Sequence, residues 1–167
     1  MNANLIPSNP AMTSKAIRLS AVLLVALSVS SQAQVGPAAA EAEVLEVVTR
    51  IFDGMREADS AKVRTAFAPG ARFVNIGTRA NPDTITYDAV DGWLSGIARS
   101  SKTWEERVRN VRIQVDGNVA SAWMDYTFVL NGAVRHCGIN SIALAKVAGA
   151  WKITQLADTR RTTGCTG

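Results

Sequence analysis

The segment that decides the fold is Val119–Val147, with the sequence VASAWMDYTFVLNGAVRHCGINSIALAKV. Two β-rich stretches, Val119–Leu130 and Val134–Val147, flank the dipeptide Asn131-Gly132. Asn-Gly between two such stretches is typical of the tight turn of a β-hairpin, because both residues tolerate a positive φ. The segment therefore predicts two long antiparallel strands.

The neighbouring segments extend this hairpin into a meander. Thr103–Val115 and Trp151–Thr159 are also β-rich, and the turn signals Asp116-Gly117-Asn118 and Ala148-Gly149 separate them from the hairpin. We expect four long antiparallel strands.

Upstream of the meander the apolar residues follow a helical period. Three helices are predicted, over Glu41–Ala58, over Ala61–Phe67 and from a cap at Thr84 or Thr86 to about Gly96–Ser101, with a short strand over Arg72–Ile76. Helices followed by strands indicate an α+β domain, in which the three helices pack on one face of a curved antiparallel sheet.

Counting outward from the Asn131-Gly132 turn predicts which side chains share a face. In an unbroken ladder a two-residue turn places Leu130 opposite Ala133 and Thr127 opposite His136. On this register the inner face carries Arg109, Val111, Ile113, Trp123, Asp125, Thr127, His136, Asn140, Ile142, Leu144, Trp151, Ile153 and Gln155. Large residues at one end and polar residues at the other suggest a core that opens into a pocket.

The opposite face of the same strands is also mostly apolar. It carries Ala120, Ala122, Met124, Tyr126, Phe128, Cys137, Ile139, Ser141, Ala143 and Ala145. A sheet face in contact with water would alternate with polar residues, and no predicted helix remains to cover this one. We therefore expect a homodimer that packs through the outer sheet face.

The first 33 residues have the features of a secretory signal peptide. Lys15 and Arg18 precede the apolar run Leu19–Val29, and Ser31–Ala33 supplies the small residues of a cleavage site. A retained membrane anchor is the alternative, but 11 apolar residues cover only about half of the hydrocarbon layer. We predict a signal peptide over 1–33, a linker over 34–40, a domain over 41–167, and a periplasmic or secreted protein without a membrane contact after cleavage.

The composition fits one globular domain. The chain has 167 residues, of which 47% are hydrophobic and 19% are charged. Its formal net charge is +4, and two of the positive charges belong to the leader. This balance gives no support to nucleic-acid binding.

The chain has two cysteines, Cys137 and Cys165. Export to an oxidising compartment favours disulfides, so we expect these two residues to pair. Two free buried thiols are the alternative.

The order of elements resembles the nuclear transport factor 2-like superfamily. The resemblance rests on the Asp-initiated short helix, on Phe67–Phe73 (FAPGARF), and on a meander that ends in Gly149–Ile153 (GAWKI). It covers roughly Glu41–Cys165 and implies a cone-shaped fold, which ketosteroid isomerase, SnoaL-type cyclases and limonene epoxide hydrolase share. Arg135–Gly138 (RHCG), together with Trp151–Ile153 and the terminal Asp158-Thr159 with Cys165, looks most like the lumazine-binding branch. This fold hosts many unrelated activities, so the resemblance says little about chemistry.

The sequence departs from the enzymes of this superfamily. Steroid isomerases carry a catalytic carboxylate on the first strand, where this chain offers Asn75. Epoxide hydrolases use an Asp, Arg, Asp set, of which Asp125 and Arg109 could supply two members. The predicted register places Asp158 on the other face unless a bulge intervenes.

Several inner-face residues are candidates for a site. His136, the one histidine, and Asp125 are the candidate catalytic residues, by proton transfer. A structural histidine and a cross-strand ion pair of Asp125 with Arg109 are the alternatives. Asn140 needs hydrogen-bond partners, which a ligand could supply. The candidate ligand-binding residues are Arg109, Trp123, Asp125, His136, Asn140 and Trp93.

Three functions remain open at this point. The sequence favours an exported small-molecule-binding or accessory domain with a small apolar or aromatic ligand and no defined reaction. A small hydrolase or isomerase working through His136 and Asp125 is the alternative, and a protein-interaction module using the outer sheet face is a second alternative. No metal site is predicted, because His136 lacks neighbours at ligand spacing, and no cofactor motif is found.

Overall fold

The computed structural model describes residues 36–76 and 84–166. The chain divides into two units, Met1–Ala33 and Gln34–Gly167, and every described residue belongs to the second. The predicted signal peptide over 1–33 lies outside the described residues. Among the helices that the structure describes, none is long and apolar enough to cross a membrane.

Helix α1 spans Pro37–Arg56 and starts earlier than the sequence pattern predicts. The predicted linker over 34–40 is therefore wrong for Pro37–Ala40, which form the first turn. A proline suits this position because the first N–H groups of a helix have no intrahelical partner, and alanine has the highest helix propensity. The face of α1 that carries Val44 and Ile51 is fully buried against the sheet.

Two shorter helices lie where the pattern predicts them but with different bounds. Phe67 begins a strand instead of ending the second helix, and neither Thr84 nor Thr86 caps the third, because Ile85–Ala89 form a strand and Ala89 is the N-cap.

The Asp59 carboxylate caps α2 (Ser60–Arg64) by accepting a 2.8 Å hydrogen bond from the Lys62 backbone N–H. Helix α3 spans Val90–Arg99 and buries Leu94 and Ile97, as its helical period predicts.

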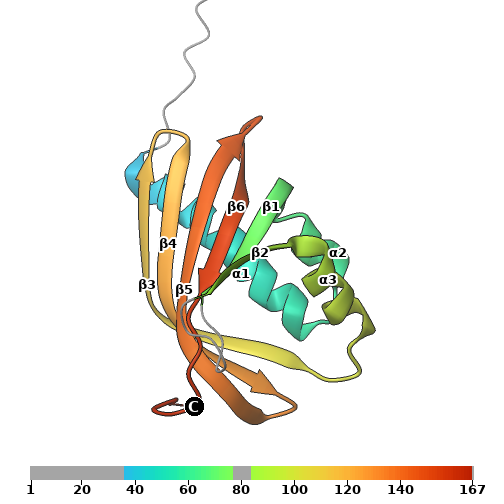
Figure 1. The fold of residues 1–167 in the computed structure, drawn as a ribbon. Coiled ribbons are helices and arrows are strands. Elements are labelled where there is room, and N and C mark those ends of the chain that lie inside the picture. The colour runs from blue at the N-terminus through green and yellow to red at the C-terminus, as the bar shows by residue number, and fades with distance from the viewer. Residues whose placement is uncertain (1–35, 77–83, 167) are drawn as a thin grey trace, which may run out of the picture. The chain divides into compact units, whose positions relative to one another are not determined.

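The sheet has six strands in the order β2-β1-β6-β5-β4-β3. The strands are β1 (Phe67–Ile76), β2 (Ile85–Ala89), β3 (Trp104–Asp116), β4 (Val119–Leu130), β5 (Ala133–Val147) and β6 (Ala150–Asp158). The four predicted meander strands are confirmed. The sheet is mixed and not purely antiparallel, because β1 pairs in parallel with β6. Figure 1 shows the three helices together on one side of this sheet.

Strand β2 was not predicted from the sequence. All five of its residues are exposed, so no buried face produces an alternating pattern. It runs antiparallel to β1 at the edge of the sheet and leads directly into α3.

The predicted register of the central hairpin is wrong beyond its first two pairs. Asn131 and Gly132 adopt the positive φ of the expected turn, and Leu130 pairs with Ala133. Arg135 is then bulged out, so that His136 pairs with Phe128 instead of Thr127. This extra residue shifts the pairing between β4 and β5 by one position beyond the bulge. Each β4 side chain there lies on the face opposite to the one predicted.

The bulge reverses the predicted faces of β4. Ala120, Ala122, Met124 and Tyr126, predicted for the outer face, are buried on the side of the helices together with Ile142 and Leu144 of β5. Trp123, predicted for the inner face, lies on the other side and is 51% exposed. The outer face of β4 is thus the more polar one, and the β4 half of the apolar surface from which the homodimer was predicted lies against this chain's own helices, whereas Ile139, Ala143 and Ala145 of β5 stay on the outer face.

Candidate functional site

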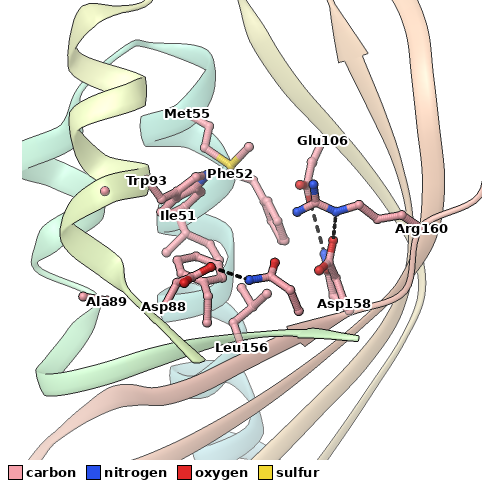
Figure 2. Close-up of a pocket in the computed structure, with 14 residues that line it drawn as sticks. Ile51, Phe52, Met55, Asp88, Ala89, Trp93, Glu106, Leu156, Asp158 and Arg160 are labelled. Atoms are coloured by element: carbon pink, nitrogen blue, oxygen red, sulfur yellow. Dashed lines mark hydrogen bonds and ion pairs between the residues drawn. The ribbon is translucent and has the colours of Figure 1, made fainter. Parts of the chain in front are cut away.

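A cavity of about 450 Å³ opens between the helices and the inner face of the sheet. Most of its wall is apolar and comes from α1, β1, α3 and β6. Its apolar lining residues are Ile51, Phe52, Met55, Phe73, Ala89, Trp93 and Leu156. Figure 2 shows Ile51, Met55 and Trp93 on one side of this cavity and three charged residues, Glu106, Asp158 and Arg160, close together on the other.

Glu106 brings a carboxyl group into this cavity from β3. It pairs with Phe128 on β4, which in turn pairs with His136 on β5, so all three residues lie on the inner face. One carboxylate oxygen, Oε2, accepts a 3.0 Å hydrogen bond from the Asn140 side-chain amide, and Asn140 itself is buried. Glu106 keeps intermediate exposure because it lines the cavity.

Burial raises the pKa of Glu106 to about 7. The hydrogen bond from Asn140 works in the opposite direction by stabilising the carboxylate, but it does not compensate for the lost hydration. The neighbouring Asp158 raises the pKa further, whereas the Arg160 guanidinium lowers it. Glu106 therefore changes its protonation state close to neutral pH.

Asp158 and Arg160 form an ion pair next to Glu106 and Asn140, since Asp158 pairs with Asn140 across β6 and β5. The Arg160 Nε donates a 2.6 Å hydrogen bond to Asp158 Oδ2, and the Tyr126 hydroxyl donates to the same oxygen over 3.2 Å. The Asp158 side chain is only 10% exposed. Burial, and then the negative charges of Asp158 and Glu106, raise the pKa of Tyr126 far above its usual value, so its hydroxyl stays a hydrogen-bond donor.

The C-terminal segment that follows β6, residues 159–166, returns along β5, and we call it the strap. Its residue Arg161 exchanges two backbone hydrogen bonds with Cys137, each of 2.9 Å. A disulfide then joins Cys137 to Cys165, with a Cα–Cα distance of 5.5 Å, as predicted. These contacts fix the strap against β5 next to Arg160, whose side chain reaches the cavity.

A second polar pair lies on β1 and β2. The Asn75 side-chain amide donates a 2.7 Å hydrogen bond to Asp88 Oδ2, and both residues line the cavity. Asn75 holds the position at which the sequence lacked the carboxylate of the steroid isomerases. Asp88, one strand away, places a carboxylate nearby.

A second cavity, of about 490 Å³, adjoins the first. The two share the residues Met55, Trp93, Glu106 and Arg160. His136 lines the second cavity, where its ring lies 4.9 Å from that of Phe128, centroid to centroid. Burial, and then the Arg160 charge, lower the pKa of His136 and favour its neutral form.

Three of the six predicted ligand-binding residues line these cavities. Trp93 lines both, Asn140 lines the first and His136 the second. Of the catalytic candidates, the structure therefore brings His136 to a cavity but not Asp125.

The other three lie on the outer face because of the bulge at Arg135. Asp125 accepts a 2.7 Å hydrogen bond from the Asn110 side chain, and Arg109 donates to the Thr166 hydroxyl. Arg109 does pair with Asp125 across the strands, as predicted, but no ion pair joins them within the described residues. Trp123 is exposed.

Sequence reasoning missed Glu106 and Arg160 entirely and placed Asp158 on the wrong face. One signal was available in β4, where Ser121, Asp125 and Thr127 alternate with five apolar residues. That alternation alone predicts that Asp125 faces away from the core. Glu106 then falls on the inner face, because it is separated from Arg109 by an odd number of positions.

The charged groups of the site are suited to proton transfer with a bound molecule. Within residues 36–76 and 84–166, no three His, Cys, Asp or Glu side chains lie together in a way that could hold a metal ion. A carboxyl group that titrates near neutrality, beside a fixed guanidinium, can instead take up and release a proton.

Comparisons with known proteins agree on the fold. The family model described as "SnoaL-like domain" matches residues 44–157. An NTF2-like protein of unknown function from Shewanella baltica has a TM-score of 0.64 at 20% identity, over 77% of this chain and 99% of its own. A comparison with curated proteins gives no match.

Two further solved structures carry activity names. A "putative dehydratase" of the NTF2-like family from Streptomyces avermitilis has a TM-score of 0.64 at 11% identity, over 77% of this chain and 100% of its own. A "putative scytalone dehydratase" from Novosphingobium aromaticivorans has a TM-score of 0.59 at 12% identity, over 72% of this chain and 83% of its own. At these identities the likeness concerns the α+β NTF2-like fold.

Proposed function

Since this chain belongs to the SnoaL-like domain family, we propose that its cavity binds a small, largely apolar molecule and that Glu106 transfers a proton to or from it. The observation that carries the proposal is the desolvated Glu106 carboxyl, with a pKa of about 7, in an otherwise mostly apolar wall. General acid–base catalysis is most efficient when the pKa of the group lies near the working pH.

The reaction class that fits best is the elimination of water from a β-hydroxy ketone. The Glu106 carboxylate removes the proton next to the carbonyl carbon, and the Arg160 guanidinium stabilises the enolate oxygen that forms. The C–O bond to the hydroxyl then breaks as the C=C bond forms, and the leaving hydroxyl takes the proton from Glu106. One water is released and the carboxylate is regenerated. The names of the two dehydratase relatives support this class.

A simple β-hydroxy ketone tests this function directly. We expect the protein to convert 4-hydroxy-4-phenylbutan-2-one to the conjugated enone, which is followed by its ultraviolet absorbance. Glu106→Gln keeps the shape of the side chain and its ability to accept from Asn140, but cannot take up the proton. The variant should lose at least about 100-fold in rate.

Asp125→Asn is the matched control, because Asp125 is a carboxylate on the outer face of the same sheet. We expect it to leave the rate unchanged. Equal rates for the wild type and Glu106→Gln would contradict the proton-transfer role. Binding of the ketone without turnover would favour the binding or accessory function predicted from the sequence.

Two finer expectations stay proposals. The lumazine-binding branch rests on the motif Arg135–Gly138 and on Trp151–Ile153. Export to the periplasm or outside the cell rests on the signal-peptide pattern of residues 1–33. N-terminal sequencing of the exported protein tests the cleavage after Ala33.

The homodimer also stays a proposal, now on a smaller apolar surface. Val119 and Trp123, on the same face of β4, are 66% and 51% exposed. Sedimentation at micromolar concentration tests it, and a monomer there would contradict it. If the dimer forms through this face, Trp123→Ser should dissociate it.

A further inference from the structure

The second cavity differs from the first in its charge. The first has three acidic residues and one basic residue in its wall, namely Asp88, Glu106, Asp158 and Arg160. The second has three basic residues and one acidic residue, namely Arg99, Lys102, Arg160 and Glu106. Glu106 and Arg160 are common to both, so the combined space runs from an acidic end to a basic end.

Two of the three cations at the basic end have no ion-pair partner among residues 36–76 and 84–166. Arg160 is paired with Asp158, but neither Arg99 nor Lys102 forms an ion pair with any residue that the structure describes. Arg99 ends α3, where a positive charge also favours the helix dipole. Two uncompensated cations in one cavity wall attract an anion.

The loop that carries Lys102 is held in place. The Ser100 hydroxyl accepts a 3.1 Å hydrogen bond from the Lys102 N–H and donates one of 2.9 Å to the Lys102 carbonyl. The next residue, Thr103, is tied to the β4–β5 turn, since its N–H donates to the Asn131 side chain over 2.8 Å. The backbone position of Lys102 is thus set before a ligand arrives, and its exposed side chain extends from this fixed point.

Aromatic side chains form the wall between these cations and Glu106. Trp104 packs edge-on against Phe128, with ring centroids 5.9 Å apart and planes at 89°. Its ring also lies close to Gly96 of α3, where a Cβ atom would come within 3.2 Å. Trp93 completes the wall shared by both cavities. Such a wall suits a flat apolar group.

We propose that the ligand is an apolar or aromatic carboxylic acid, whose carboxylate binds Arg99 and Lys102 and whose body extends along Trp104 and Trp93 toward Glu106. This inference rests on the proposed function and names the substrate class of that same site. The carboxylate end supplies binding energy and orientation, and it leaves the far end of the molecule at the proton-transferring group.

Comparing an acid with its amide separates binding that needs the carboxylate charge from binding that needs only the apolar body of the ligand. The probes are 3-phenylpropionate and 3-phenylpropanamide, which have nearly the same shape and differ in charge. His136 is the one histidine of the chain and lines the second cavity, so its ring signals in NMR report occupancy without assignment of other residues. We expect the wild type to bind the acid at least tenfold more tightly than the amide.

Two double variants test the subsite. Arg99→Gln with Lys102→Gln should remove the preference for the acid and leave the affinity for the amide unchanged. Arg72→Gln with Arg112→Gln removes two exposed cations that line neither cavity, and should keep the preference. Lys102→Gln alone is the substitute if the first double variant does not fold.

The outcomes separate this inference from the proposed function. The carboxylate subsite is overturned if the wild type binds acid and amide equally, or if the preference for the acid survives in the Arg99 and Lys102 double variant. In either case the role of Glu106 is still tested by the ketone assay. Failure of both probes to bind overturns the subsite, and together with an inactive ketone assay it also removes the proposed function.

Discussion

Glu106 makes the stability of the protein depend on pH. Its pKa is about 7 in the folded state, against 4.5 for an unperturbed glutamate, so the folded protein holds the proton over this range more often than the unfolded chain does. The free energy of unfolding attributable to Glu106 is therefore fully present below pH 4.5 and is lost as the pH rises through 7, by up to about 3 kcal/mol.

We expect Glu106→Gln to become more stable relative to the wild type as the pH rises from about 4.5 to about 8. Urea unfolding of both proteins at several pH values measures the difference, in which the other carboxylates and His136 largely cancel. A difference that stays constant with pH would contradict the raised pKa of Glu106.

Gly138 allows the strap to approach β5. A Cβ atom at this position would lie 1.8 Å from the Thr159 carbonyl oxygen, which is a backbone atom and cannot turn away. We expect Gly138→Ala to destabilise the protein by about 1–3 kcal/mol, as overpacking does. Chemical denaturation measures the loss.

Gly92→Ala is the matched control for this substitution. A Cβ atom at Gly92 would meet nothing within 4 Å, and Gly92 lies within α3, where alanine is the better helix former. We expect it to be neutral or to stabilise by up to about 1 kcal/mol. A loss of stability equal to that of Gly138→Ala would rule out the close approach of Thr159 as the cause.

At the scale of elements, the disulfide holds the strap to β5. It joins residues separated by 28 positions, and the chain-entropy model gives such a bridge about 3.5 kcal/mol. We expect Cys165→Ser to lower the free energy of unfolding by roughly this amount. Addition of a reductant should lower the stability of the wild type but not that of the variant, and equal sensitivity of the two would contradict the bridge.

The hairpin of β4 and β5 was predicted only in part from local sequence patterns. Its strands and its turn were predicted correctly, because Asn131-Gly132 and the β-rich stretches are local signals. The bulge at Arg135 was not predicted, since it depends on how both strands pack against the helices. Because of that one bulged residue, Glu106 lines the cavity and Asp125 lies on the outer face.

At the scale of the molecule, the described residues share one hydrophobic core. Buried side chains from α1, α2, α3 and the sheet form a single cluster. We expect a chain that starts at Gln34 to unfold in one cooperative transition, with coincident curves from tryptophan fluorescence and far-ultraviolet circular dichroism. Two separate transitions would show that the core is divided.

The class of the fold, the four meander strands, the presence and order of three helices and the pairing partners of the disulfide could be predicted from the sequence alone. These follow from periodicity, turn residues and the count of cysteines, which act over short distances or need no geometry. Which carboxyl groups meet in the cavity depends instead on contacts between distant parts of the chain. Glu106 lies on β3, whereas Asp158 ends β6 and Arg160 follows it, and the register that brings them together depends on a single bulged residue. The free energy of that bulge depends on packing across the whole sheet.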